Sequence, residues 1–278
     1  MSNRNEGRMV APNVPQPKEQ KSSLLDFVSP TQFVDLPSQG IGYPEGHPLC
    51  GKKDVEIRYM TAKDEDILSS ESLLKKGLAV DRFLENVIIG DISSDYILIG
   101  DKNAILIAAR ISGYGNLYET QISCPSCGTT NELTFNLNNK EITHGTLPED
   151  GSVTKNENGN FNVTLPMCKV NVEFRLLTGK DEKLMIKRIT DAKKHKRETS
   201  TFTDQYKLMV VSAQGETNRA QLNQFVELIP VGDSKVLRDA YMAVSPDVKI
   251  KDDFECISCG HEQELEVPFG ADFFWPNQ

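Results

Sequence analysis

Two short cysteine motifs constrain the fold of this chain more than any other feature of its sequence. CPSCG stands at Cys124–Gly128 (the first knuckle) and CISCG at Cys256–Gly260 (the second knuckle). A C-x-x-C turn presents two thiolates from one loop, and a structural Zn²⁺ takes four ligands in a tetrahedron, so two such turns complete one site. The glycine after each pair permits a backbone conformation that directs amides toward sulfur. The sequence therefore predicts one closed, structural Zn²⁺ site with the ligands Cys124, Cys127, Cys256 and Cys259.

The sequence leaves other uses of these cysteines open. A redox C-x-x-C usually opens a helix after a strand, whereas alternating apolar residues predict strands after both knuckles here. Two separate metal sites are a further alternative, and the residues that could complete them are Cys50, Cys168, His144 and His261. We expect Cys50 and Cys168 to be ordinary thiols, because neither has a C-x-x-C partner. We expect His261 to lie beside the site or at the surface.

The chain also repeats itself at two places. VEIRYMTAKDEDIL from Val55 matches VEFRLLTGKDEKLM from Val172 at an offset of 117 residues. The second knuckle follows the first at an offset of 132 residues, and at that offset the dipeptide GD at Gly100 coincides with GD at Gly232. Because both matches occur in the same order, we infer an internal duplication. Each copy is expected to run from a strand through helices to a knuckle between strands.

These patterns predict a mixed α+β fold in which two similar, helix-rich lobes are joined by a zinc ribbon-like site of four cysteines. The polar N-terminus, which can bury little, predicts a flexible arm over residues 1–30. We expect the first lobe with the first knuckle at residues 31–137 and a polar linker at residues 138–160. The second lobe, with the second knuckle and an aromatic C-terminal tail, is expected at residues 161–278.

Shorter patterns predict individual elements. Apolar residues on nearly all sides of Ala104–Ile111 predict a buried helix, and Tyr206–Val211 and Leu222–Ile229 are also typical of helices. Thr61 and Thr178 are expected to cap helices, because a threonine oxygen suits an N-cap and acidic residues follow in the first turn. The Gly- and Pro-rich run FVDLPSQGIGYPEGHPLCGK predicts mostly loop.

Charge and motif content exclude several function classes. The chain has 31 Lys and Arg against 40 Asp and Glu, a net charge of −9. A protein that coats nucleic acid needs basic surface, and the knuckle flanks TTNELTFN and HEQELEVP carry no Lys or Arg. Nucleic acid is therefore not expected as a partner, and a zinc-ribbon nucleic-acid-binding or regulatory protein is the alternative function. No Walker loop, GxSxG, HExxH or dinucleotide fingerprint occurs, so we expect no enzyme.

The length and position of the apolar segments predict where the protein resides and which residues contact partners. No stretch approaches the roughly 20 apolar residues of a membrane helix, and the N-terminus lacks the apolar core of a signal peptide. We therefore expect a reducing cytoplasm, where paired cysteines favour metal binding over disulfides. The candidate partner contacts are Leu24, Leu25, Phe27, Phe273, Phe274 and Trp275. Aromatic residues are favoured interface anchors, but the C-terminal ones are equally expected to pack on their own domain.

The order of several motifs resembles one protein family. FVDLPSQGIGYPEGHPL, VEIRYMTAKDEDIL, DKNAILIAARISGYG, CPSCG, VEFRLLTGKDE, the second knuckle and the final FFWP resemble the baseplate hub subunits of T-even-like contractile-tailed bacteriophages (myoviruses), over about Phe33–Pro276. The resemblance implies a structural, non-enzymatic component of the central hub of the tail baseplate, needed for tail assembly. It implies other baseplate and hub proteins as partners, copies of this chain included. It also implies a location in the virion tail baseplate, and in the host cytoplasm during assembly.

Overall fold

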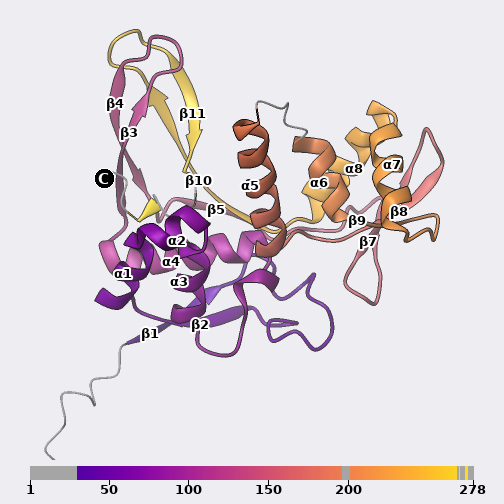
Figure 1. The fold of residues 1–278 in the computed structure, drawn as a ribbon, viewed down its shortest axis with the longest axis horizontal. Helices are drawn as coiled ribbons and strands as arrows, with labels where there is room; N and C mark the ends of the chain where they lie inside the picture. Colours follow the sequence, from indigo (N-terminus) through magenta and orange to yellow (C-terminus); the bar gives the residue numbers. More distant parts are fainter. Residues whose placement is uncertain (1–29, 196–200, 268, 270–272, 275–278) are drawn as a thin grey trace, which may run out of the picture. The chain divides into compact units, whose positions relative to one another are not determined.

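The first half of the chain folds as a β-hairpin, a group of helices and a second β-hairpin. The computed structural model describes residues 30–195, 201–267, 269 and 273–274. The elements of this half are β1 (Thr31–Asp35), β2 (Asp54–Arg58), α1 (Ala62–Ser69), α2 (Glu71–Lys76), α3 (Ala79–Val87), the 3-10 turn η2 (Ser94–Tyr96), α4 (Ile99–Tyr114), β3 (Leu117–Ser123) and β4 (Thr130–Asn136) (Figure 1). β1 pairs antiparallel with β2, and β3 pairs antiparallel with β4.

Among the described residues, the second half of the chain contains a four-stranded sheet, four helices and a three-stranded sheet. Its elements are β5 (Lys140–Thr143), β6 (Val153–Lys155), β7 (Phe161–Leu165), β8 (Val170–Phe174), α5 (Gly179–Lys194), α6 (Thr201–Met209), β9 (Val210–Ala213), α7 (Arg219–Leu228), α8 (Val231–Val244), β10 (Asp247–Glu255) and β11 (Glu262–Glu266). An antiparallel sheet has the strand order β6-β7-β8-β9. β10 pairs with β11 at one edge and with β5 at the other.

The segments that lead from β2 into α1 and from β8 into α5 have the same local structure. Thr61 is the N-cap of α1 and Thr178 is the N-cap of α5, as predicted. The amide and the hydroxyl of Thr61 both donate to Asp64, at 2.8 and 2.8 Å. Thr178 donates to Asp181 in the same way, at 2.9 and 3.1 Å. Each aspartate thus accepts from a backbone amide at the helix start, and its negative charge suits that end of the helix.

An arginine next to the strand completes each segment. Arg58, the last residue of β2, donates two hydrogen bonds to Asp64, at 2.7 and 2.9 Å. Arg175, directly after β8, donates two to Asp181, at 2.7 and 2.8 Å. A two-pronged guanidinium–carboxylate pair fixes direction as well as distance. The strand end and the helix start are therefore held in one geometry in both halves.

A further pair of aspartates lies in the first turns of two other long helices, α4 and α8. Asp101 in α4 accepts from the amide and hydroxyl of Ser38, at 2.8 and 2.6 Å, and from the hydroxyl of Tyr43, at 2.7 Å. Asp233 in α8 accepts from the amides of residues 167 and 168, both at 2.9 Å. Ser38 and Tyr43 lie between β1 and β2, and residues 167–168 lie between β7 and β8. Each long helix therefore anchors the loop of the hairpin in its own half.

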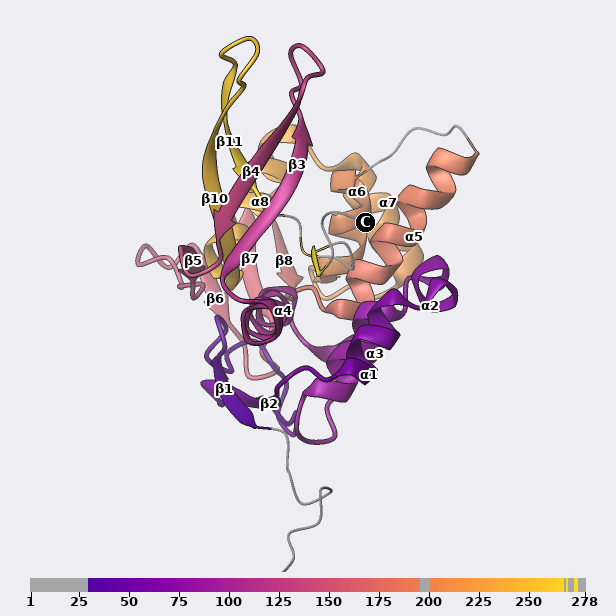
Figure 2. The ribbon, with the colours of Figure 1, turned by 90° about the vertical axis from the view of Figure 1, so that its left-hand side faces the viewer.

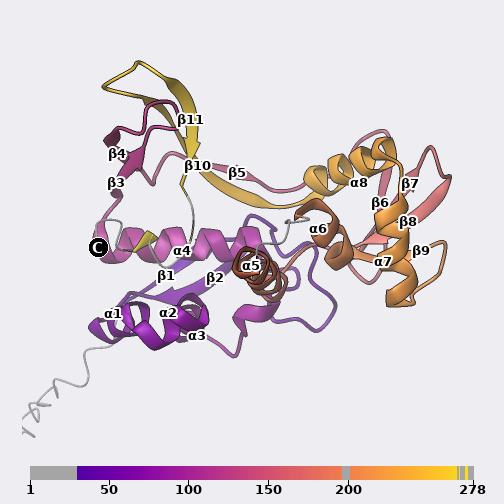
Figure 3. The same cartoon turned by 45° about the horizontal axis from the view of Figure 1, so that its top comes forward.

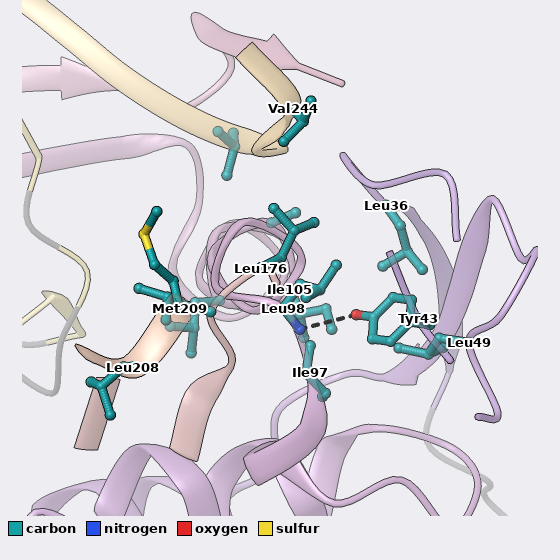
Figure 4. Close-up of a cluster of buried hydrophobic side chains, with 14 of the residues drawn as sticks. Leu36, Tyr43, Leu49, Ile97, Leu98, Ile105, Leu176, Leu208, Met209 and Val244 are labelled. Carbon is teal, nitrogen blue, oxygen red and sulfur yellow. Dashed lines mark hydrogen bonds between the residues drawn. The ribbon is translucent and has the colours of Figure 1, made fainter. Parts of the chain in front are cut away.

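One continuous apolar core extends through both halves. Figure 4 shows Leu98 and Ile105 from the first half close to Leu176 and Met209 from the second. In the same region the Leu98 amide donates to the hydroxyl of Tyr43, at 3.1 Å. The two halves are therefore joined by this core as well as by the cysteine cluster. The halves also share buried apolar surface, whose removal from water is a major source of stability.

Several local predictions can be compared with the structure. The predicted linker, residues 138–160, contains β5 and β6, because its backbone finds partners in β10 and β7. The helix predicted to reach Val211 ends before Val210–Val211, which begin β9; branched side chains at Cβ suit a strand paired with β8. Phe33–Asp35, expected in a loop, belong to β1. The predicted helices at Ala104–Ile111 and Leu222–Ile229 are confirmed as parts of α4 and α7, although α7 ends one residue earlier.

Candidate metal centre

The two knuckles are the turns of the hairpins β3–β4 and β10–β11, which lie side by side, with β4 in contact with β10 (Figure 2). In the first knuckle the Cys124 amide donates to the Thr129 carbonyl, and in the second the Cys256 amide donates to the His261 carbonyl, both at 2.9 Å. The glycine amide then donates to the carbonyl of the first cysteine, at 2.8 and 2.9 Å respectively. Both glycines have positive φ, 75° and 65°, which residues with a Cβ rarely adopt. The two turns are therefore the same structure.

The four cysteine sulfurs converge between the hairpins. Cys124 Sγ lies 3.7 Å from Cys259 Sγ, and Cys127 Sγ lies 3.6 Å from Cys256 Sγ. All four ligand atoms lie within 4.8 Å of one another, and all four thiols are free of disulfides. Tetrahedral Zn–S bonds of about 2.3 Å place neighbouring sulfurs about 3.8 Å apart. The donor set and its spacing therefore fit a four-coordinate thiophilic cation.

The surrounding hydrogen bonds act unequally on the thiols. Backbone bonds from Cys259 and Ser258 lower the pKa of the Cys256 thiol to about 6. A backbone bond at His261 favours the Cys259 thiolate, but the neighbouring Cys127 thiol and burial raise the pKa of Cys259 to about 11. Hydrogen bonds from Thr129 lower the pKa of Cys127 as well, so the thiols differ in how readily they ionise. A divalent cation favours the thiolate form of every ligand, because metal binding takes thiolates and releases their protons.

A match to a protein family covers both knuckles and most of the chain. Residues 45–275 match the family described as T4 bacteriophage base plate protein. The chain belongs to this family. Curated proteins and solved structures give no match. Membership in a T4 baseplate family indicates a structural protein of the phage baseplate, with other baseplate proteins around it in the virion tail.

In this member of the T4 baseplate family, a buried asparagine links the two knuckles. The Asn131 side-chain amide donates to the Thr129 carbonyl at 2.8 Å, and its oxygen accepts from the Ile257 amide at 2.9 Å. Its nitrogen also lies 3.7 Å from Cys256 Sγ. Asn131 therefore orients the second knuckle from the first hairpin. This role could not be predicted from the repeat, which has Gln263 at the corresponding position.

A small apolar cluster lies beneath the sulfurs. Phe254 is buried with Cys124 and Cys256, and Leu133 and Leu265 pack against them. Leu133 lies in β4 and Leu265 lies in β11, the strands that the alternating apolar residues after each knuckle predicted. The cluster excludes water from one side of the cysteines, which strengthens electrostatic interactions there.

The outer surface of the β10–β11 hairpin is acidic. Asp253 faces Glu264 across the strands and Glu255 faces Glu262, and Lys251 pairs with Glu264 at 2.8 Å. Carboxylates directly opposite one another repel and also repel phosphate. The exposed face of this hairpin is therefore negatively charged around the pair of Lys251 with Glu264.

The other predicted metal-site residues lie apart from the cluster. The group of possible ligands among the described residues contains the four knuckle cysteines and neither Cys50, Cys168, His144 nor His261. Cys50 is exposed, and His144 contacts the Pro37 carbonyl at 3.0 Å. The geometry therefore favours one shared site over two separate ones. Among the helices of the described residues, none has the length and apolar character to cross a membrane.

Two of the aromatic C-terminal residues, Phe273 and Phe274, pack on their own chain. Phe273 and Phe274 are buried, 1% and 2% exposed. The Phe274 ring lies 5.0 Å from Phe83, and the Phe273 ring lies 5.2 Å from Tyr118. These rings fill the core of their own chain, which is one of the two roles that the sequence left open for them. The remaining candidates, Leu24, Leu25, Phe27 and Trp275, lie outside the described residues.

Proposed function

We propose that this protein is a structural component of the central hub of a phage tail baseplate and is needed for tail assembly. The family match over residues 45–275 carries the proposal. The closed set of four thiols supports a non-enzymatic role, since four protein ligands leave a metal no position for a substrate. Its partners are other hub and baseplate proteins, first in the host cytoplasm and then in the virion.

The metal in this proposal is a structural Zn²⁺ held by Cys124, Cys127, Cys256 and Cys259. The sulfur spacing of 3.6–3.7 Å across the knuckles and the two matching turns support this choice. Purified protein should contain about one zinc per chain by elemental analysis. A chain purified without chelators that holds no zinc, or holds iron instead, would contradict it.

The proposal includes an internal duplication, with copies at residues 31–137 and 161–278, a link at 138–160 and an arm at 1–30. Three pairs of equivalent features support it: the Thr–Asp–Arg segments, the aspartates at the start of α4 and α8, and the knuckles. In each pair the residues differ by the offsets of 117 or 132 that the sequence shows. A pseudo-twofold relation near the metal would let one tetrahedral ion join two equivalent chain ends.

The hub role has a direct genetic test. Phage with an early stop codon in this reading frame should fail to form usable tails, and infected cells should accumulate baseplates that lack a complete centre. Supplying the intact protein in trans should restore assembly. Normal, infectious tails made without the protein would overturn the role.

A further inference from the structure

The start of α4 is covered by the second half of the same chain. The Ile99 amide donates to the Leu177 carbonyl at 3.2 Å, and the Gly179 amide donates to the Ile97 carbonyl at 2.9 Å. These two bonds form an isolated antiparallel bridge between Leu98 and Thr178. The first turn of α4 is thereby tied to the segment that enters α5.

A close backbone approach completes this cover. A Cβ on Gly100 would lie 2.2 Å from the carbonyl oxygen of Pro246, so only glycine fits there. Pro246 stands between α8 and β10. Within the chain, the start of α4 therefore docks onto two places of the second half: the entry to α5 and the exit from α8.

The equivalent start of α8 is exposed at its first two residues. At the offset of 132 residues, Ile97–Ile99 correspond to Ile229–Val231. Val231 is 86% exposed and Leu228 is 82% exposed. Met167, 64% exposed, lies against Gly232, where a Cβ would meet its Sδ at 2.7 Å. We call Met167, Leu228, Val231 and Gly232 the open end; Figure 3 shows α7 and α8, which meet there.

The backbone at the open end is also available for pairing. Within the part of the chain that the structure describes, the Val231 amide and the Ile229 carbonyl have no backbone partner. Their counterparts at Ile99 and Ile97 make the two bonds of the bridge. Pro230, at the place of Leu98, does not obstruct such a bridge, because the bonds use the groups of the residues on either side.

The first half carries the matching surface. At the offset of 117 residues, Leu177–Gly179 correspond to Met60–Ala62, and at the offset of 132 residues Pro246 corresponds to Tyr114. Met60–Ala62 and Tyr114 line one hollow of the surface. The counterpart of this hollow in the second half is the place that receives the start of α4. One chain therefore carries both surfaces: the open end lies in its second half and the hollow in its first half.

We propose that the open end of one chain binds the hollow at Met60–Ala62 and Tyr114 of a second copy of this chain. The Val231 amide donates to the Met60 carbonyl of the neighbour, and the neighbour's Ala62 amide donates to the Ile229 carbonyl. Val231 and Leu228 lose their exposure to water in the contact. This inference rests on the proposed duplication and adds a partner and a surface to it.

The contact between chains cannot copy the internal one at every atom. Ala62 has a methyl group where the internal segment has Gly179, at which a Cβ would lie 2.4 Å from the Ser94 carbonyl oxygen. The contact is therefore wider at Ala62. Because the two surfaces differ, the association is head-to-tail, and such contacts form rings when the rotation closes and filaments when it does not.

Two single variants and their mixture test the geometry. The intact chain should show a mass above the 31.0 kDa of one chain in sedimentation equilibrium. Val231→Arg should sediment as one chain, and so should Ala62→Arg, because each destroys one side of the contact. Their mixture should form a dimer, since one chain still offers an intact hollow and the other an intact open end. Met242→Arg, at a residue 63% exposed elsewhere on α8, should associate as the wild type does.

The outcomes separate this inference from the proposed function. A wild-type chain that stays at 31.0 kDa at every concentration, a Val231→Arg chain that still assembles, or a mixture without dimers would each overturn the inference. None of these results would alter the zinc content or the assembly defect of phage lacking the protein. Circular dichroism and zinc content identical to wild type in both variants would show that the loss of association is not a loss of fold.

Discussion

The segments β2–α1 and β8–α5 keep the same hydrogen bonds in different surroundings. Asp64 has no exposed side-chain surface and also accepts from the Asn86 side chain at 2.6 Å, whereas Asp181 is 5% exposed. Burial opposes ionisation of Asp64, but the bonds from Arg58, Thr61 and Asn86 outweigh it and lower its pKa to about 2.

The pKa of Asp181 is lowered as well, by Arg175 and Thr178 against burial. The pattern of three residues, Arg, Thr and Asp, at the start of a helix is therefore local and repeats with the sequence. The pKa of each aspartate also depends on neighbours outside the repeated segment, such as Asn86, which donates to Asp64.

The largest expected effect tests whether the two halves are equivalent at the metal. Cys124→Ser and Cys256→Ser should each lower the unfolding midpoint by roughly 10 °C or more, because loss of one ligand weakens metal binding that is coupled to folding. Thermal unfolding with and without a chelator measures this. The chelator should have little further effect on either variant.

Cys50→Ser is the matched control, since this thiol is exposed and outside the cluster. It should unfold at the wild-type temperature. A strong effect of one knuckle and none of the other would show that the two halves do not share one ion.

The second effect compares the aspartates of the long helices. Asp101→Ala should lower the free energy of unfolding by about 2–4 kcal/mol, because it leaves the donors of Ser38 and Tyr43 unpaired in the interior. Asp233→Ala should cost less, because Asp233 accepts from two donors, the amides of residues 167 and 168, whereas Asp101 accepts from three. Urea unfolding of both variants gives the difference. Equal losses would contradict the idea that the number of unpaired donors sets the cost.

The third effect is the pH dependence of the two arginine pairs. A carboxyl with a lowered folded pKa stabilises the protein above its unfolded pKa, near 3.8, and this contribution is lost as the pH falls toward about 2. Both Asp64 and Asp181 should therefore contribute to acid unfolding in that range. Asn86→Ala should raise the pKa of Asp64 and leave that of Asp181 unchanged, which NMR titration of the carboxyl groups can follow. A shift of Asp181 in this variant would contradict the independence of the two segments.

The smallest effect concerns the helix caps. Thr61→Ala and Thr178→Ala should each cost about 0.5–1 kcal/mol, since each removes a side chain that bonds the aspartate but leaves the arginine in place. Thr61→Ser and Thr178→Ser, which keep the hydroxyl, should recover most of this loss in the same urea measurement. Unequal costs would show how far the surroundings change a contact that the sequence encodes twice.

The sequence was informative where structure is local. The knuckles depend on two cysteines and a glycine within five residues, and the caps depend on a threonine and an aspartate three residues apart. Such contacts close within one turn of the chain, so their geometry follows from residue type and spacing. The pairing of β5 with β10, the role of Asn131 and the burial of Phe273 could not be predicted, because each depends on a partner more than a hundred residues away.

By itself, the sequence determined that this chain has two matching knuckles, two capped helices after strands and a glycine–aspartate dipeptide that recurs at the offset of the knuckles. Only the tertiary structure decided how the copies differ: the start of α4 is covered and the start of α8 is exposed. The reason is physical. Identical local segments form the same hydrogen bonds wherever they occur, whereas burial depends on which other parts of the chain are packed against them. The segment that enters α5 covers the start of α4, whereas Val231 at the start of α8 is exposed.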